Sequence, residues 1–429
     1  MAINNHPEAQ WFKGAGLGMF IHWGIGSLTG LDISWSMMKD KPWCKGKEEF
    51  ENISPEEYWR LAEKFNPTSY EPDKWLAAAR EAGMEYMVFT VKHHDGYALW
   101  PSEFGNFGTK KYLGGRDLVG EYVDACRRQG VKVGLYFSLS DWYHPDTYVP
   151  DNFGTFTRFH ETPVADGNEL ARFERFYAYV KGQVTELISR YGRIDLFWFD
   201  GDIWNKSIDN RMSDLYNLIR TKQPHIVIND RGGCPILGDF KTPECQLSRA
   251  PIDGWWEACY IWQNGGWGYD FREDYKEMDW TLKLLATTVG GGGNLLLNVG
   301  PRPDGELPAV VYERLGALKE WMHGNRSSIK GTERGPRILG CNHPVTGRDG
   351  IWYIHILAGN DGLFKIGGVP EPVQVSLLRN GMKLEYSYNE GVLCIELPQQ
   401  HRASGDEVVT VTWPHSAEAY NNQAFQYAE

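Results

Sequence analysis

The sequence predicts an α/β fold built on parallel strands, followed by a small antiparallel β-sandwich. In the first part, amphipathic helices alternate with short apolar strands, most clearly at a helix over 170–191 followed by Leu196–Phe199. A strand that is apolar on both faces is typical of a parallel sheet covered by helices. After residue 333, short alternating segments lie between turns, as in a sandwich. The 429 residues therefore divide into a barrel-sized domain at 1–332 and a sandwich with a tail at 333–429.

The elements of the first domain follow from apolar runs and helical periodicity. Strands one to five are predicted at 18–23, 87–91, 131–137, 196–199 and 225–229, strand six at 257–261, and the last strand at 294–299. No segment predicts the seventh strand. Helices are predicted at 56–65, 73–82, 117–128, 170–191, 211–222 and 308–322. Residues 145–168 predict a long polar loop.

The second domain is predicted from period-two alternation bounded by Gly and Asn turns. Its strands are expected at 351–356, 374–378, 392–397 and 407–413, and residues 415–429 are expected to form a tail.

Composition narrows the functional class. A formal net charge of -12 without a basic stripe argues against a nucleic-acid partner. The seven cysteines are an odd number without a Cys-x-x-Cys pair, which fits free thiols in a reducing compartment. The start of the chain shows no signal-peptide pattern and no apolar run reaches membrane-spanning length, so we expect a cytoplasmic protein without a membrane partner. The 18 Trp, 22 Tyr and 19 Phe suit either a sugar site or an aromatic-rich core.

Polar side chains gather at or just beyond the carboxyl ends of the predicted strands. Any one of them has an ordinary structural explanation, such as a helix cap, an ion pair or a buried histidine bonded to a carbonyl. Because barrel enzymes place their chemistry at this end of the strands, the set as a whole predicts an active site. The residues are His22, His93, His94, Tyr136, Asp200, Arg231 and Glu244.

Two chemistries fit these residues. The first is glycoside hydrolysis by a pair of carboxylates, with Asp200 as the nucleophile because a strand end fixes it. The second is metal-dependent hydrolysis. Its ligands would be His93, His94, Asp95, Asp200 and Asp202. The metal reading is weaker because adjacent histidines are poorly spaced as ligands on a strand.

Several motifs, in order, resemble those of the retaining α-L-fucosidases of glycoside hydrolase family 29. They are Trp11-Phe12, the stretches 18–24 and 92–97, 134–138 with Asp141-Trp142, 198–201, 267–269, and 297–301 with Asp304-Gly305. They span about 11–306. The resemblance implies an imperfect (β/α)8 barrel as the catalytic domain, a C-terminal β-sandwich, double displacement, and neither a metal nor another cofactor.

The resemblance also implies roles for single residues. Asp200 matches the family's nucleophile, and Arg231 matches an arginine that contacts the nucleophile region. Trp267 matches an aromatic that packs on the methyl side of the sugar. The residues implied to bind sugar hydroxyls are His22, His93, His94 and Tyr136.

The general acid/base has two candidates, Glu244 and Glu257. A general acid must reach the leaving-group oxygen on the outer side of the sugar, which favours the loop residue Glu244 over the strand-start residue Glu257. Glu257 is accordingly assigned to substrate binding or to a structural role.

The chain departs from the family where Ser34-Trp35-Ser36 replaces a common Glu-Trp-Tyr motif. Trp35 keeps its place as a substrate-binding aromatic, and the missing carboxylate would have to come from Glu48 or Glu49. Because that carboxylate holds sugar hydroxyls, an α-L-galactosidase of the same mechanism is one alternative, and an inactive sugar-binding relative is another. The expected partner is a fucosylated oligosaccharide or glycoconjugate, and the sequence is compatible with a homo-oligomer.

Overall fold

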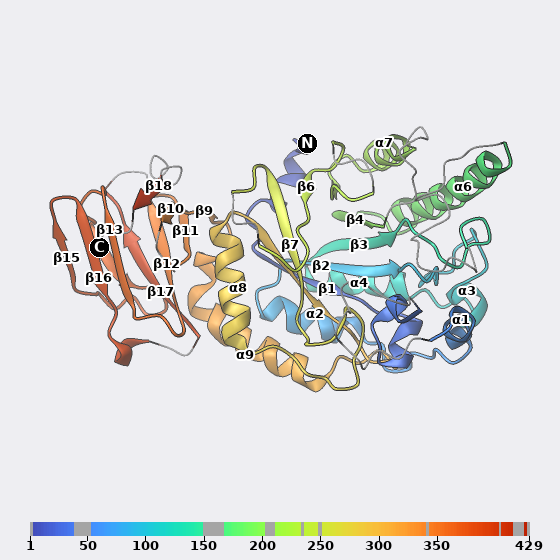
Figure 1. Ribbon diagram of the computed structural model, residues 1–429, viewed down its shortest axis with the longest axis horizontal. Coiled ribbons are helices and arrows are strands. Elements are labelled where there is room, and N and C mark those ends of the chain that lie inside the picture. The colour runs from blue at the N-terminus through green and yellow to red at the C-terminus, as the bar shows by residue number, and fades with distance from the viewer. Residues whose placement is uncertain are drawn as a thin grey trace.

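The computed structural model describes residues 3–37, 53–148, 167–201, 211–232, 236–247, 251–339, 343–402, 405–414 and 424–426. Two bodies of structure are visible, a sheet surrounded by helices and a smaller pair of facing antiparallel sheets (Figure 1). The smaller body lies beside α8 and α9.

The first body is a parallel eight-stranded barrel. Its strand order is β5-β4-β3-β2-β1-β8-β7-β6, and a parallel bridge between Asn229 and Phe240 joins the two ends of this order. The predicted imperfect (β/α)8 barrel is therefore confirmed. The strands are β1 (Leu17–Ile21), β2 (Tyr86–Lys92), β3 (Lys132–Ser138), β4 (Leu196–Asp200), β5 (Val227–Ile228), β6 (Phe240–Lys241), β7 (Trp255–Ile261) and β8 (Asn294–Val299).

The structure corrects the strand count predicted from the sequence. The run assigned to strand six is β7, and the strand that was missing from the prediction is β6. It is only two residues long, so it offers no apolar run to recognise. Its position is fixed instead by the Asp239 carboxylate, which accepts a hydrogen bond from the Ile228 amide at 2.8 Å.

The helices lie mostly where their periodicity predicts them. The predicted helix 56–65 is shorter, since α1 ends at Arg60 and a 3₁₀ turn follows at Leu61–Glu63. Helices α3 and α8 were not predicted. The helices are α1 (Pro55–Arg60), α2 (Pro72–Glu81), α3 (Thr109–Tyr112), α4 (Leu118–Gln129), α6 (Gly167–Arg190), α7 (Met212–Lys222), α8 (Met278–Gly290) and α9 (Ala309–Asn325). None of the described helices combines the length and apolar composition needed to cross a bilayer.

Strand residues alternate between two apolar clusters, as the period of two requires. On β1, Met19 and Ile21 belong to the cluster between sheet and helices, whereas Phe20 belongs to a second cluster with Tyr136 and Trp198. The second cluster fills the barrel. His22 has the same parity as Phe20, and Asp200 the same parity as Trp198, so both polar side chains follow the inward-facing row.

The second body is a β-sandwich, as predicted. One sheet has the order β14-β17-β12-β11-β9 and the other β13-β16-β15, all antiparallel. Residues 424–426 of the predicted tail form a strand, β18, that pairs in parallel with β10. The strands are β9 (Glu333–Arg334), β10 (Arg337–Leu339), β11 (Val345–Arg348), β12 (Ile351–Leu357), β13 (Leu363–Gly367), β14 (Gln374–Leu377), β15 (Tyr386–Asn389), β16 (Val392–Glu396), β17 (Asp406–Thr412) and β18 (Ala424–Gln426).

Candidate active site

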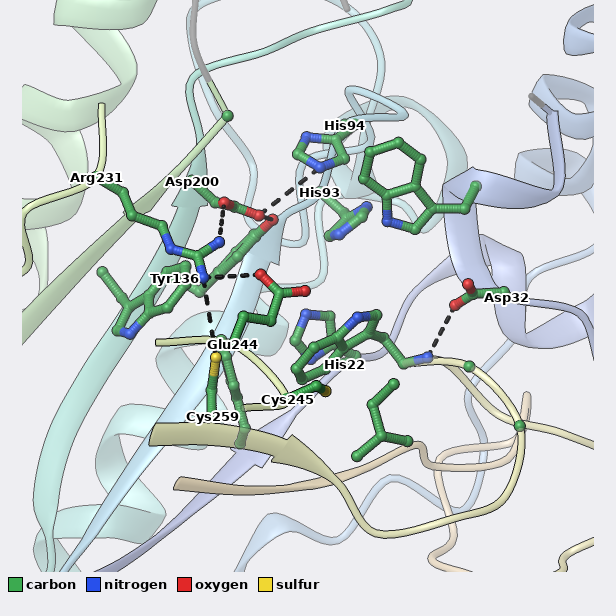
Figure 2. A pocket seen from close by; sticks show the side chains of 18 residues that line it. His22, Asp32, His93, His94, Tyr136, Asp200, Arg231, Glu244, Cys245 and Cys259 are labelled. Atoms are coloured by element: carbon green, nitrogen blue, oxygen red, sulfur yellow. Dashed lines mark hydrogen bonds and ion pairs between the residues drawn. The ribbon is translucent and has the colours of Figure 1, made fainter. Parts of the chain in front are cut away.

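A cavity of about 480 Å³ opens at the carboxyl ends of the barrel strands. Its volume lies in the range of small-molecule sites. Figure 2 shows how acidic, basic and imidazole side chains converge on it from several strands. Its walls are formed by Phe20, His22, Asp32, Trp35, His93, His94, Tyr136, Trp198, Asp200, Gly201, Arg231, Glu244, Cys245, Cys259, Ile261, Gly265, Gly266 and Trp267.

Asp200, the last residue of β4, holds its carboxylate in the cavity through two donors. The Tyr136 hydroxyl donates to Oδ2 at 2.7 Å, and Arg231 Nη1 donates to Oδ1 at 2.9 Å. Burial by itself would raise the pKa of Asp200. The charge of Arg231 and the Tyr136 hydrogen bond outweigh it and leave the pKa below its ordinary value. Asp200 is therefore ionised at neutral pH, as a nucleophile must be.

Arg231 connects Asp200 to a second carboxylate. Its Nη2 donates to Glu244 Oε2 at 2.7 Å and to the Thr242 carbonyl at 3.2 Å, and its Nε donates to Thr242 Oγ1 at 3.0 Å. Its guanidinium also lies 4.6 Å from the ring centre of Trp198. Figure 2 shows Asp200 and Glu244 on different edges of the same guanidinium. The Glu244 side chain is 42% exposed, against 19% for Asp200, so it lies at the more open side of the cavity.

Three neutral histidines line the cavity. Burial lowers the pKa of His22 to about 3 and that of His94 to about 4, and it lowers the pKa of His93 well below its ordinary value. Each uses Nδ1 within the protein: His22 with Asn298 Oδ1 at 2.6 Å, His93 with Ser34 Oγ at 2.5 Å, and His94 with Ser138 Oγ at 2.6 Å.

The hydrogen-bond chains assign the tautomers of two of these rings. Ser138 Oγ donates to the Ser140 carbonyl, so it accepts from His94 Nδ1. Asn298 Nδ2 donates to the Trp267 carbonyl, so its amide oxygen accepts from His22 Nδ1. In both rings Nε2 is consequently the unprotonated nitrogen, which accepts a hydrogen bond. Neutral acceptors of this kind suit the hydroxyl groups of a sugar.

Aromatic rings form two further walls. The Trp35 ring lies 4.9 Å from His94, and the Trp267 ring lies 5.0 Å from His22. Trp267 is fixed at its backbone, because its amide donates to Asp32 Oδ1 at 2.8 Å. Flat apolar faces beside neutral acceptors match the C–H and hydroxyl faces of a sugar ring.

The structure does not place Glu257 in the cavity wall, which corrects its assignment as a substrate ligand. Its carboxylate is fully buried at the start of β7 and accepts from Tyr86 Oη at 2.5 Å and from Trp198 Nε1 at 3.0 Å. The physical reason is its height along the strand: it precedes Cys259 and Ile261, which do line the cavity. The other residues predicted as catalytic or substrate-binding line the cavity. Asp95, a candidate metal ligand, does not, because its carboxylate accepts hydrogen bonds from Tyr58 Oη at 2.8 Å and from the Tyr97 amide at 2.9 Å.

Sequence reasoning missed several wall residues. Trp198 and Phe20 lie two residues before Asp200 and His22, and this parity was the signal that could have found them. Asp32 lies in a loop, and no periodic pattern marks it. The predicted residues Glu48, Glu49 and Asp202 lie outside the described part of the chain.

The donor set of the alternative metal site is partly assembled. Ligand atoms of His93, His94 and Asp200 lie within 4.8 Å of one another. However, both oxygens of Asp200 already accept hydrogen bonds, one of them from a guanidinium 2.9 Å away. A divalent cation here would displace these donors and face the positive charge of Arg231. These contacts therefore suit an anionic nucleophile better than a metal ligand.

Comparisons with known proteins agree with this geometry. The family model described as alpha-L-fucosidase matches residues 1–327. The tissue alpha-L-fucosidase of Bos taurus is 32% identical over 351 residues, covering 76% of this chain and 70% of its own. The structure of alpha-L-fucosidase isoenzyme 1 from Paenibacillus thiaminolyticus superposes with a TM-score of 0.79 at 32% identity and covers 95% of this chain and 98% of its own. The Thermotoga maritima alpha-fucosidase in complex with fucose gives a TM-score of 0.75 at 27% identity, with 94% and 96% covered.

Proposed function

The chain belongs to the α-L-fucosidase family, and on that premise we propose how its site removes terminal α-L-fucosyl residues, with Asp200 as nucleophile and Glu244 as general acid/base. The observation that carries this proposal is the guanidinium of Arg231, which bonds an ionised carboxylate in the cavity and a second carboxylate at its open side. The proposed substrate is a fucosylated oligosaccharide or glycoconjugate.

In the first step, an Asp200 oxygen attacks the anomeric carbon while Glu244 gives its proton to the glycosidic oxygen. The carbon–oxygen bond to the leaving group breaks, and a glycosyl ester on Asp200 forms. This ester has no negative charge, so the charge of Arg231 is then shared with Glu244 alone.

In the second step, Glu244 takes a proton from water, the water oxygen attacks the anomeric carbon, and the ester bond to Asp200 breaks. Two displacements at one carbon return the original α configuration. For this mechanism we expect the two carboxyl groups to lie about 5–5.5 Å apart when sugar is bound.

Sugar recognition is assigned to the neutral histidines and the aromatic walls. His22 and His94 present Nε2 as acceptors, so they bind hydroxyl hydrogens without adding charge beside Asp200. Trp267 and Trp35 supply the apolar faces. Rates on aryl α-L-fucoside, aryl α-L-galactoside and aryl β-D-fucoside, measured side by side, identify the preferred sugar, and we expect the α-L-fucoside to be fastest.

The test of the two catalytic roles compares substrates with good and poor leaving groups. Glu244→Ala should cripple cleavage of natural fucosides far more than of activated aryl fucosides, because a good leaving group departs without a proton. Added azide should accelerate this variant. Asp200→Ala should lose several orders of magnitude in turnover, and azide should restore part of it with inversion.

The opposite pattern would reverse the assignment. If leaving-group dependence and azide rescue appear in Glu257→Ala and not in Glu244→Ala, then Glu257 is the acid. Full activity in Asp200→Ala would end the proposal for the nucleophile. Loss of activity with a chelator, and its return with added metal, would favour the metal-dependent alternative.

A further inference from the structure

A buried acid lies inside the barrel, beneath the catalytic cavity. Glu257 is fully buried, and its carboxylate oxygens accept from Tyr86 Oη at 2.5 Å and from Trp198 Nε1 at 3.0 Å. Burying a carboxyl group is unfavourable unless its hydrogen bonds are made, and an apolar side chain would fill the same space without that cost. An acid at this height of the barrel therefore calls for an explanation other than packing.

The barrel also makes room for Tyr86, the second side chain that bonds Glu257. A Cβ atom added to Gly18 would lie 2.5 Å from the nearest atom of the Tyr86 ring, so only glycine on β1 allows this ring to reach the barrel interior. Tyr86 thus holds one side of the carboxylate, and Trp198 holds the other.

Trp198 links Glu257 to the nucleophile. Its ring stacks on Tyr136, with centres 5.5 Å apart at 22°, and the Arg231 guanidinium lies 4.6 Å from its centre. Tyr136 and Arg231 are the two side chains that bond the Asp200 carboxylate. Any rotation of the indole would therefore move both partners of Asp200 together.

We propose that Glu257 is a positioning residue: by accepting the Trp198 Nε1 proton it fixes the indole against which Tyr136 and Arg231 are held on Asp200. This inference rests on the proposed role of Asp200 as nucleophile. Trp Nε1 is a donor only, and its buried proton has to reach an acceptor. The direction of that acceptor sets the plane of the ring.

Loss of the acceptor has a specific consequence for Asp200. The nucleophile is buried, and burial favours its neutral form, while Arg231 and Tyr136 favour its ionised form. When the indole is released, the contacts from Arg231 and Tyr136 weaken, and the proton on Asp200 is lost only at higher pH. A general loss of stability would lower the amount of folded enzyme but would not move this titration.

The experiment is the pH dependence of kcat/KM on an aryl α-L-fucoside for the full chain, with thermal melting recorded beside it. Glu257→Ala and Trp198→Phe should move the acid limb upward by on the order of one pH unit and lower kcat/KM by up to about 100-fold. Glu257→Gln should keep the acid limb near its original pH, because the amide oxygen still accepts from Nε1. Tyr86→Phe removes a hydrogen bond from the same carboxylate on its other side and should leave the limb in place.

Two results would overturn the proposal. One is an unshifted acid limb in Glu257→Ala, whatever Trp198→Phe shows, and the other is a shift in Tyr86→Phe as large as that in Glu257→Ala. If Glu257→Ala does not fold, Glu257→Leu, which removes the acceptor and fills the space, takes its place. Asp200→Ala, assayed in parallel, separates the two proposals, since its activity tests the nucleophile whatever the Glu257 variants do.

Discussion

At the residue scale, the site depends on one cation shared between two acids. Arg231 donates from Nη1 to Asp200 and from Nη2 to Glu244, while its Nε and the Thr242 hydroxyl fix its plane. A planar guanidinium can serve two acceptors in fixed directions, which an ammonium group cannot do with equal precision. The three neighbouring histidines are neutral, so Arg231 supplies the main positive charge that keeps Asp200 ionised.

Removing the positive charge of Arg231 should change the titration of Asp200. In Arg231→Gln, burial of Asp200 is no longer offset by the guanidinium, so the pKa of Asp200 rises. Because the reaction needs ionised Asp200, the acid limb of kcat/KM should move to higher pH, by about 1–3 units. Arg128→Gln, which breaks a surface pair with Asp73, should leave the profile unchanged. A profile in Arg231→Gln that keeps its acid limb would show that other groups ionise Asp200.

Most residues that line the cavity through strand ends could be predicted because they follow a rule about position. His22, Tyr136 and Asp200 lie near the carboxyl ends of buried strands, and barrels bring those ends together. The rule says nothing about height within a strand. Glu257 was predicted as a site residue because it is an acid on a barrel strand. It lies near the start of β7, however, and its carboxylate accepts a hydrogen bond from Trp198 beneath the cavity. Asp32 was missed because its role comes from a loop contact with the Trp267 amide.

At the element scale, the barrel is closed at its shortest strands. β5 and β6 have two residues each, and the contact between them uses side-chain as well as backbone bonds. Asp239 donates its amide to the Ile228 carbonyl at 2.7 Å, and its carboxylate accepts from the Ile228 amide and from Arg220 Nη2 at 2.6 Å. Long strands can be recognised in a sequence by their apolar runs. The pairing of β5 with β6 depends on one aspartate instead, so the sequence could not reveal β6.

Removing that aspartate should open the seam. Asp239→Ala leaves the buried Ile228 amide without an acceptor and Arg220 without its partner, which should cost about 3–5 kcal/mol of unfolding free energy. Since Arg231 follows β5 directly, kcat should fall as well. Denaturant unfolding measures the loss, and Asp124→Ala, which removes an exposed ion pair with Arg127, should change it by less than about 1 kcal/mol. Equal stability in the two variants would show that backbone pairing alone closes the barrel.

At the scale of the whole molecule, the barrel and the sandwich have separate apolar cores and meet through helices. The sandwich core is a cluster of its own, and the Trp321 indole of α9 donates to the Asp406 carbonyl of β17 at 2.9 Å. In Figure 1, strands β2 and β3 point away from the sandwich, so the catalytic end of the barrel is remote from it. None of the described residues that line the cavity comes from the sandwich.

Stability as a function of pH is set by buried groups within the barrel. Burial lowers the pKa of His22 to about 3 and of His94 to about 4, so the folded chain binds fewer protons at these sites than the unfolded chain. Their stabilising effect is complete above the ordinary histidine pKa of about 6.5 and is lost as the pH falls below it. Glu257 acts in the opposite direction. Burial, partly offset by the bonds from Tyr86 and Trp198, raises its pKa to about 7.

The raised pKa of Glu257 makes the stability of the protein fall with rising pH. Because folded Glu257 retains a proton that the unfolded chain releases near pH 4.5, its contribution to stability falls as the pH rises from there to about 7. Glu257→Gln keeps the shape of the side chain and removes this titration. Relative to the unchanged protein, its free energy of unfolding should therefore increase between pH 5 and pH 8, by up to roughly 3 kcal/mol. Denaturant unfolding at several pH values measures the difference, and a constant difference would show that Glu257 has the same charge in both states.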